Sequence, residues 1–227
     1  MLQINYQDNG AKIAQLSLKR SLWLARLKVV PSNVMITPNS PSSINPVAKY
    51  IEDIYQRYYG ATISVHYPKL LSVSDETGRI LAAVGIRVAD TEPLFLEQYF
   101  DEPIERMICA PRNSIVEIGN LASNGGGASL YLFEALSAYM HHQAYTKAVV
   151  TCTGSLEARL KLMGLDPKRL AAAKPNLLLG EGENWGSYYQ TDPHVLVGSI
   201  DKGYQRLQHV LNAEFIDLPS VVMMKEH

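Results

Sequence analysis

Apolar residues recur at helical spacing directly after a polar, turn-rich stretch from Pro38 to Pro46. Asn45 is suited to cap a helix N-terminus, and Pro46 stands at the first helical position. Gly60 supplies a stop. Between these signals the apolar positions lie three and four residues apart, at Val47, Tyr50, Ile51, Ile54 and Tyr58. The pattern predicts an amphipathic helix between Asn45 and Gly60.

The second half of the chain predicts further helices. The first follows three glycines and has a stripe of apolar residues on one face. The second begins at Ser155 and ends at Gly164, and the third lies near the C-terminus. Asp166-Pro167 begins a further short helix, and another lies near Leu94–Phe100 in an otherwise irregular segment. The marker residues of the first three are, in order, Leu132, Phe133, Leu136, Tyr139 and Met140; Leu156, Leu160 and Met163; and Tyr204, Leu207 and Leu211.

Strand patterns fill the space between these helices. The run "KLLSVSDETGRILAAVGIRV" predicts a β-hairpin that turns at Asp75-Glu76-Thr77-Gly78. Ser114 to Leu121 and the β-branched run Lys147 to Cys152 predict two more strands. The runs "GSYYQ" and "HVLVGSI", on either side of Asp192-Pro193, predict a final pair. Antiparallel strands thus lead into a strand–helix–strand unit, so the predicted class is α/β (α+β) with a central mixed sheet.

Composition and charge narrow the class of protein. Of the 227 residues, 47% are hydrophobic and 19% are charged, which is enough apolar surface for a sizeable core. The 21 basic and 22 acidic side chains nearly cancel, which argues against nucleic acid as a partner. The N-terminus lacks a signal-peptide pattern, and no apolar run is long enough to span a bilayer. We therefore expect a soluble, cytoplasmic protein.

Metal and disulfide chemistry find little support in the sequence. The two cysteines, Cys109 and Cys152, match neither a disulfide framework nor a zinc pattern, and we expect both to be reduced. His66, His141 and His142 lack the spacing of metal ligands. The sequence therefore predicts that the protein binds no metal.

The stretch "VEIGNLASNGGGASLYLFEAL" carries the most informative chemistry. Gly125, Gly126 and Gly127 stand between a predicted strand and a predicted helix. Glycines cost conformational entropy unless the backbone takes unusual angles or approaches something closely. Amide groups in such a turn, together with the helix dipole, can hold a phosphate or an oxyanion. The turn can equally serve only to reverse the chain, so both interpretations stay open.

The order of elements around this turn resembles the GNAT acyltransferase superfamily. Within it, "VEIGNLA" is similar to the glutamate-bearing strand of acyl-homoserine-lactone synthases and N-acyl amino acid synthases. Together with "YIEDIYQRYYGATISVHYPKLLSV" and "RLKLMGLDPKRLAAAKPN", it resembles the thermostable hemolysin family from about Arg26 to Gly198. The resemblance implies a GNAT-like fold with a largely antiparallel sheet flanked by helices. It also implies one domain over 1–227, with elaborations at 1–44 and 201–227 around a core at 45–200.

Two departures from the relatives bear on the chemistry. The lactone synthases read Glu-x-Ser-Arg on this strand, whereas Glu117 is followed here by Ile118, Gly119 and Asn120. The missing arginine argues against lactone formation from S-adenosylmethionine. The usual GNAT turn has Arg or Gln ahead of its glycines, where this chain has Ser123-Asn124. We therefore expect no fixed cation near the turn, which favours a carrier-bound donor slightly over free coenzyme A.

The resemblance implies direct transfer of an acyl group from a thioester to a small-molecule amine. The donor carries a phosphopantetheine arm, as in coenzyme A or an acyl-carrier protein. Glu117 is the implied general base and Asn120 a polar helper. The implied arm-binding residues are Leu121, Ala122, Ser123, Asn124, Gly125, Gly126 and Gly127, and the implied substrate-binding residues are Thr151, Cys152, Thr153, Trp185 and Tyr188.

Structural alternatives exist for each of these residues. Glu117 could face solvent or pair with Arg112, and Asn120 could be an ordinary residue at a strand end. Cys152 could be a covalent nucleophile, but the sequence places no histidine to activate it. Trp185, Tyr188 and Tyr189 could wall an acyl channel or simply belong to the core.

Two other functions compete with acyl transfer. The family's name points to a membrane-active toxin, and "SLKRSLWLARLKVV", Ser17 to Val30, is a basic segment with apolar residues and Trp23. The same segment alternates well enough to be a strand with Leu22 and Leu24 on one face, which we favour over membrane contact. The third possibility is a catalytically inactive GNAT-like binding module.

Overall fold

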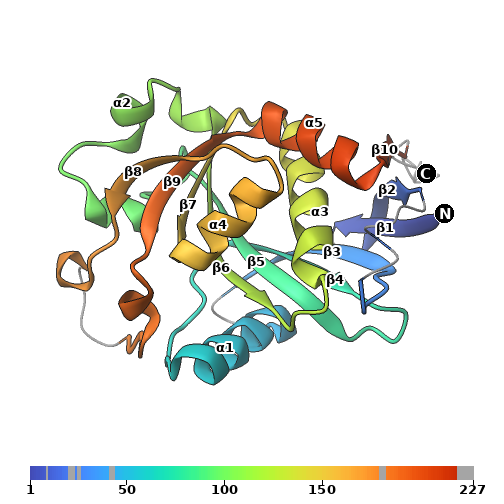
Figure 1. Cartoon of the computed structure of the whole chain (residues 1–227), viewed down its shortest axis with the longest axis horizontal. Coiled ribbons are helices and arrows are strands. Elements are labelled where there is room, and N and C mark those ends of the chain that lie inside the picture. Colours follow the sequence, from blue (N-terminus) through green and yellow to red (C-terminus); the bar gives the residue numbers. More distant parts are fainter. Residues whose placement is uncertain (9, 20–23, 25–26, 41–43, 179–182, 219–227) are drawn as a thin grey trace, which may run out of the picture.

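The computed structural model describes residues 1–8, 10–19, 24, 27–40, 44–178 and 183–218. Its centre is a ten-stranded sheet in the order β10-β2-β1-β3-β4-β5-β6-β7-β9-β8 (Figure 1). Neighbouring strands are antiparallel except for the pairs β1–β3 and β6–β7, which are parallel. The strands are β1 (Leu2–Asp8), β2 (Ala11–Leu18), β3 (Asn33–Pro38), β4 (Lys69–Ser74), β5 (Ile80–Val88), β6 (Ile115–Ser123), β7 (Lys147–Cys152), β8 (Lys168–Ala172), β9 (His194–Ser199) and β10 (Ala213–Asp217).

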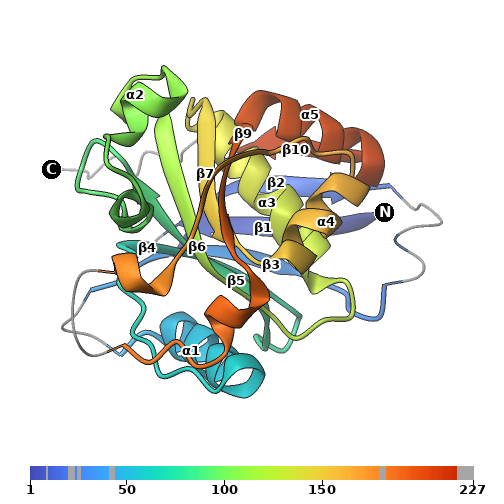
Figure 2. The same cartoon turned by 60° about the vertical axis from the view of Figure 1, so that its left-hand side comes forward.

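Helices cover both faces of this sheet. Helices α3, α4 and α5 lie together on one face, and α1 lies on the other (Figures 1 and 2). Short 3₁₀ helices stand in the connections. The α-helices are α1 (Pro46–Tyr59), α2 (Ile104–Ile108), α3 (Ala128–His142), α4 (Gly154–Leu162) and α5 (Ile200–Leu211); the 3₁₀ helices are η2 (Phe95–Tyr99), η3 (Arg112–Ser114), η4 (Pro175–Leu177) and η5 (Tyr188–Thr191).

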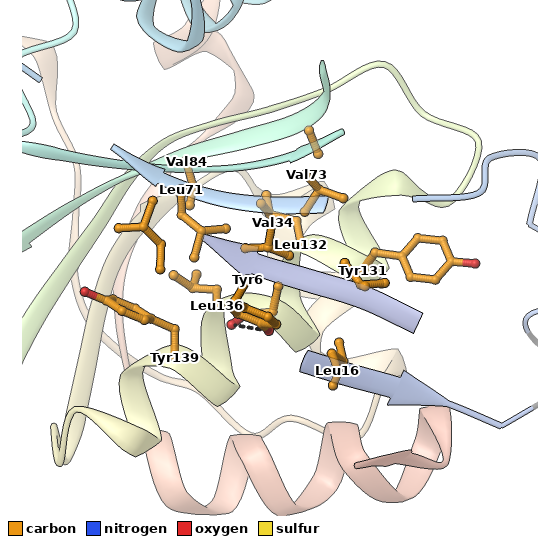
Figure 3. Close-up of a cluster of buried hydrophobic side chains, with 14 of the residues drawn as sticks. Tyr6, Leu16, Val34, Leu71, Val73, Val84, Tyr131, Leu132, Leu136 and Tyr139 are labelled. Carbon is orange, nitrogen blue, oxygen red and sulfur yellow. Dashed lines mark hydrogen bonds between the residues drawn. The ribbon is translucent and has the colours of Figure 1, made fainter. Parts of the chain in front are cut away.

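The largest cluster of buried apolar side chains lies between α3 and the strands from β1 to β5 (Figure 3). Tyr6 on β1 is fully buried there, and its hydroxyl donates a hydrogen bond to the Ala135 carbonyl of α3 at 3.1 Å. Twelve of the fifteen residues of α3 are buried. The sequence predicted a single inner stripe on this helix, but α3 is covered by the sheet and by α5 at the same time.

Several predicted elements are confirmed by the structure. Helix α1 runs from Pro46 to Tyr59, the side chain of Asn45 accepts the amide hydrogen of Val47, and Gly60 ends the helix in the left-handed conformation. The hairpin of β4 and β5, the strand β7 and the terminal helix α5 are also present. These elements share short-range signals, because caps, turns and apolar runs lie within a few residues of each other.

Other predictions were wrong. The segment after Asp166-Pro167 forms the edge strand β8, because Lys168 to Ala172 pairs with β9. The run Gly186 to Gln190 is not a strand but leads into the 3₁₀ helix η5. Helix α2 and strand β10 were not predicted. The basic segment from Ser17 to Val30 lies partly outside the described residues, and Ser17 and Leu18 end β2.

Candidate functional site

Strands β6 and β7 stop pairing before either of them ends. Their parallel register extends from Ile115 and Lys147 to Ile118 and Val150, whereas the strands continue to Ser123 and Cys152. The register between β5 and β6 also shifts at this point, and Asn120 has a positive φ of 51°. A left-handed residue in a strand marks a β-bulge, which bends the strand away from its neighbour. The bulge therefore coincides with the place where β6 leaves β7.

Tyr188 from η5 reaches the end of β7 beside this gap. Its hydroxyl donates to the Thr151 carbonyl at 3.3 Å. The ring is buried and packs on Tyr55 and Tyr59 of α1, with centroids 6.0 and 5.3 Å away, and on Trp185 at 5.5 Å. Burial raises the pKa of Tyr188 well above its ordinary value, so its hydroxyl stays protonated. The gap is thus lined by a neutral hydrogen-bond donor.

Glu117 lies on β6 and is 1% exposed. One carboxylate oxygen accepts the amide hydrogen of Phe95 and the other that of Leu96, both at 2.9 Å. The Arg87 guanidinium lies 3.5 Å away. Burial raises the pKa of Glu117, although the two amides and Arg87 act in the opposite direction. Both structural alternatives from the sequence were wrong, since Glu117 does not face solvent and Arg112 binds Glu97 and Glu105 instead.

Tyr67 completes the surroundings of Glu117. Its hydroxyl lies near the Glu117 carboxylate and acts to lower the pKa of that group, and the Arg87 guanidinium lies over its ring at 4.9 Å. The ring covers Gly85 and Gly119, which face each other on β5 and β6. A side chain on either glycine would overlap the Tyr67 ring. Gly119, one of the departures from the lactone synthases, therefore makes room for Tyr67.

Asn120 and Tyr55 link this cluster to the gap. The Asn120 side chain lies near the Tyr55 hydroxyl and opposes the rise in the Tyr55 pKa that burial causes, and Tyr55 also packs on Tyr188. A line of polar side chains therefore runs along this face of the sheet, from Glu117 past Tyr67 and Tyr55 to the Tyr188 hydroxyl at Thr151.

The three glycines connect β6 to α3, as the sequence predicted. Their φ values of 83°, 65° and 94° are all in the left-handed region. Part of the N-terminal segment packs on them, because the Lys28 amide donates to the Gly126 carbonyl at 2.9 Å. A Cβ atom on Gly127 would overlap the Leu27 side chain. Backbone conformation and this contact explain Gly126 and Gly127 without a ligand, and their proposed role in binding stays a prediction.

Two arginines stand at this turn, contrary to the expectation from the sequence. The Arg57 guanidinium of α1 donates to the Asn124 side chain at 3.3 Å. The Arg159 guanidinium of α4 donates to the Ser129 hydroxyl, in the first turn of α3, at 3.1 Å. Both side chains are exposed. Because these cations come from distant helices, residues next to the glycines gave no signal for them.

A cavity of about 630 Å³ lies on the opposite face of the sheet from Glu117, among α3, α4, α5 and the strands β6 to β9. Neighbouring residues of a strand point to opposite faces, so Ile118 lines the cavity while Glu117 does not. This volume is within the usual range for small-molecule sites. Its apolar lining comes chiefly from Ile118, Leu121, Phe133, Leu136, Met140, Val150, Leu156, Leu160 and Leu207.

The sequence did not predict this cavity. The helical periodicity identified Phe133, Leu136, Leu156 and Leu160 only as core-facing residues. Leu156 and Leu160 remain partly exposed in the folded protein. The one signal that the sequence offered is that α4 carries more apolar side chains than its packing against the rest of the protein buries.

The predicted substrate residues Thr151, Cys152 and Thr153, at the end of β7 and the start of α4, fall into different environments. Cys152 is buried, and burial raises the pKa of its thiol to about 12, which opposes a role as nucleophile at neutral pH. Thr153 caps α4, since its hydroxyl accepts the Leu156 amide hydrogen at 3.3 Å. The Thr151 hydroxyl is buried without a hydrogen-bond partner in the described part of the chain. Of these three residues, Thr151 lies nearest the Tyr188 hydroxyl.

Within the described ranges, no group of three or more His, Cys, Asp or Glu side chains is arranged to hold a metal ion. In the same part of the chain, no helix has both the length and the apolar character needed to cross a membrane.

Residues 37–204 match the profile of a family described as "Thermostable hemolysin". No curated protein matches the chain. Solved structures with a similar fold include LasI, an AHL synthase, at 13% identity with a TM-score of 0.50, covering 74% of this chain and 89% of LasI. FeeM, an N-acyl amino acid synthase from uncultured soil microbes, is 11% identical with a TM-score of 0.52, covering 78% of this chain and 96% of FeeM. TofI in an apo form is 12% identical with a TM-score of 0.52, covering 77% and 95%.

At these identities the likeness shows the fold alone. It confirms the predicted class, a mixed α/β acyltransferase-like fold whose largely antiparallel central sheet is flanked by helices.

Proposed function

The chain belongs to the thermostable hemolysin family, and from that premise we propose that it is an N-acyltransferase, which moves an acyl group from a thioester donor to an amine. The observation that carries the proposal is the unpaired gap between β6 and β7. Beyond the gap, β6 leads to the glycine turn, where Arg57 and Arg159 supply positive charge. The apolar cavity lies beside the gap. These are the parts that a charged, long and apolar acyl donor requires. FeeM and LasI are synthases with the same fold.

In this proposal the donor's phosphate lies at the glycine turn. The N-terminus of α3 carries partial positive charge, and Arg57 and Arg159 add two full charges. Phosphates attract guanidinium groups strongly because the geometry allows paired hydrogen bonds. The arm then extends along β6 from Asn124 towards Leu121, with coenzyme A or an acyl-carrier protein as its bearer.

The acyl chain occupies the cavity of about 630 Å³. Ile118 and Val150 are the last residues at which β6 pairs with β7, and both line this cavity. A thioester held in the gap beyond them therefore has an apolar space directly beside its acyl chain. Apolar burial rewards such a chain in proportion to the area removed from water.

The transfer step needs a proton acceptor for the amine and a proton donor for the leaving thiolate. The amine nitrogen attacks the thioester carbonyl, the C–N bond forms and the C–S bond breaks. We assign acceptance of the amine proton to Glu117. Because both of its oxygens are occupied, the proton passes through the Tyr67 hydroxyl. The thiolate takes its proton from Tyr188, whose raised pKa keeps the hydroxyl protonated at neutral pH.

Replacing Tyr188 by phenylalanine tests this last assignment. The variant keeps the ring and its packing on Tyr55 and Tyr59 but loses the proton donor. We expect kcat to fall by about 10²-fold, the lower end of general acid–base contributions, with little change in donor affinity. Single-turnover kinetics with a series of thiol leaving groups provides the measurement, and donors with more acidic thiols should be affected less. An equal loss for every leaving group would contradict the assignment.

The proposed function itself is tested by product analysis. Purified protein is incubated with acyl-coenzyme A or acyl-carrier protein and a panel of amines, and mass spectrometry follows the appearance of N-acyl amides. The Glu117→Gln variant is the control. If no donor is consumed but the purified protein lyses erythrocytes at nanomolar concentration, the membrane-active toxin replaces the enzyme. Tight donor binding without turnover would indicate the inactive binding module.

A further inference from the structure

The apolar cavity has a basic opening that the proposed chemistry does not use. Lys147, Lys168 and Lys202 line it together with the apolar residues described above. Lys168 and Lys202 are exposed and Lys147 is half-buried. Since most of the apolar lining is buried or half-buried, these three residues mark where the cavity meets solvent, and we call them the lysine opening.

The charges at the lysine opening are not neutralised by ion pairs within the described residues, and Asp201, the chain neighbour of Lys202, lies against His141 at 3.6 Å. Among the described residues, none of the three lysines has a carboxylate within ion-pair distance, whereas Arg169, also in the lining, is paired with Glu157 at 2.8 Å. Asp166 is the one acidic residue of the lining. The opening therefore carries an excess of positive charge next to an apolar interior, which is complementary to an amphipathic anion.

The dimensions of β7 relate this opening to the gap between the strands. Lys147 is the first residue of β7 and Cys152 the last. A strand of this length spans roughly 16 Å at about 3.3 Å per residue. Ala148 and Val150, between those ends, line the cavity as well. The cavity therefore extends along β7 from Lys147 to Val150, about 10 Å at this rise, over which part of a fatty acyl chain can lie.

We infer that the cavity binds a fatty-acid-like anion, with the hydrocarbon chain in the apolar part and the carboxylate at the lysine opening. Apolar contacts hold the chain and the lysines select the sign of the head group. The inference does not require acyl transfer. Under the proposed function, however, the fatty acid occupies the space of the acyl chain and therefore competes with the donor.

Binding of dodecanoate, below its micelle concentration and without thioester or amine, tests this inference. Calorimetry gives the stoichiometry and affinity, and the carboxyl signal of [1-¹³C]dodecanoate reports the surroundings of the head group. We expect one site per chain. Dodecyltrimethylammonium, with a chain of the same length and a cationic head, should bind at least about tenfold more weakly, and added salt should weaken dodecanoate binding.

Variants separate the two parts of the site. The double variant Lys168→Glu/Lys202→Glu should weaken dodecanoate binding at least about tenfold. The matched control Lys12→Glu/Lys19→Glu makes the same change in net charge at exposed positions within and directly after β2 and should bind like the unmodified protein. Val150→Phe fills the cavity and should weaken both amphiphiles. Circular dichroism establishes that each variant is folded.

Equal affinity for both amphiphiles, or unchanged dodecanoate binding in the Lys168→Glu/Lys202→Glu variant, would overturn the inference. The result is independent of the proposed function. Dodecanoate binding without any acyl transfer would support the fatty-acid site and contradict the proposed acyltransferase function. Turnover of dodecanoyl-coenzyme A without dodecanoate binding would support the acyltransferase function and contradict the fatty-acid site.

Discussion

Replacing Glu117 by glutamine is expected to lower acyl transfer by about 10²–10⁴-fold, the range for loss of a general base. The raised pKa of Glu117 brings it closer to neutral pH, where a base is most effective. Glutamine has the same shape but cannot take up the amine proton. The measurement is kcat/KM as a function of pH. If the proposed function holds, the unmodified protein should lose activity at low pH as Glu117 becomes protonated, and this acidic limb should disappear in the variant.

The same substitution should also reduce stability, because Glu117 holds the start of η2 through two backbone amides. A glutamine side chain offers one accepting oxygen for the two amides. A buried donor left without a partner costs roughly 1–3 kcal/mol, so a lower midpoint in urea unfolding is expected. Tyr67→Phe separates the two effects, since it removes the relay hydroxyl and keeps the carboxylate.

If Glu117 has only a structural role, Glu117→Gln will lower stability but retain the acidic limb of the pH profile. If it accepts the proton through Tyr67, Tyr67→Phe will also lose activity while η2 stays in place. Wild-type activity in both variants would remove Glu117 and Tyr67 from the catalytic assignment.

Glu134 is expected to make the protein less stable as the pH rises. This residue of α3 is 0% exposed, and neither carboxylate oxygen has a hydrogen-bond partner among the described residues. Tyr6 of β1 and Tyr204 of α5 are the titratable groups that interact with it. Burial raises the pKa of Glu134 from 4.5 to about 8. The folded protein therefore holds a proton there at neutral pH that the unfolded chain releases.

The direction of this change in stability follows from the number of protons that the folded and unfolded states bind. The folded-state pKa lies above the unfolded value, so this group's contribution is fully present below about pH 4.5. Stability then falls as the pH rises to about 8, because the unfolded state binds fewer protons over this window. At 1.36 kcal/mol per pKa unit, the loss attributable to Glu134 is on the order of 5 kcal/mol.

Urea unfolding at several pH values between 4.5 and 8.5 checks this prediction. The free energy of unfolding of Glu134→Gln should decline less with pH than that of the unmodified protein, and the two curves should diverge towards pH 8. Glu76→Gln, at an exposed position in the hairpin turn, is the matched control. Parallel curves for the unmodified protein and Glu134→Gln would show that the carboxyl group has access to solvent or to a partner.

Local signals in the sequence determined much of the secondary structure. Helix α1 followed from Asn45, Pro46 and Gly60, because a cap, a fixed φ and a stop act within a few residues. The glycine turn between β6 and α3 followed from its strand and helix patterns. The fold class followed from the order of these elements and from the family resemblance. The comparisons confirm the fold class and the family.

The tertiary structure decided what surrounds each functional candidate. Glu117 meets Arg87 and the amides of η2 only because β5 pairs with β6 and the next connection folds back. Arg159 reaches the first turn of α3 from α4. Strand β8 depends in the same way on pairing with β9. Such partners lie tens of residues apart, and helical or strand periodicity reports only which face of an element is apolar, not what covers it. The sequence therefore indicated the residues of a site, and packing determined their partners.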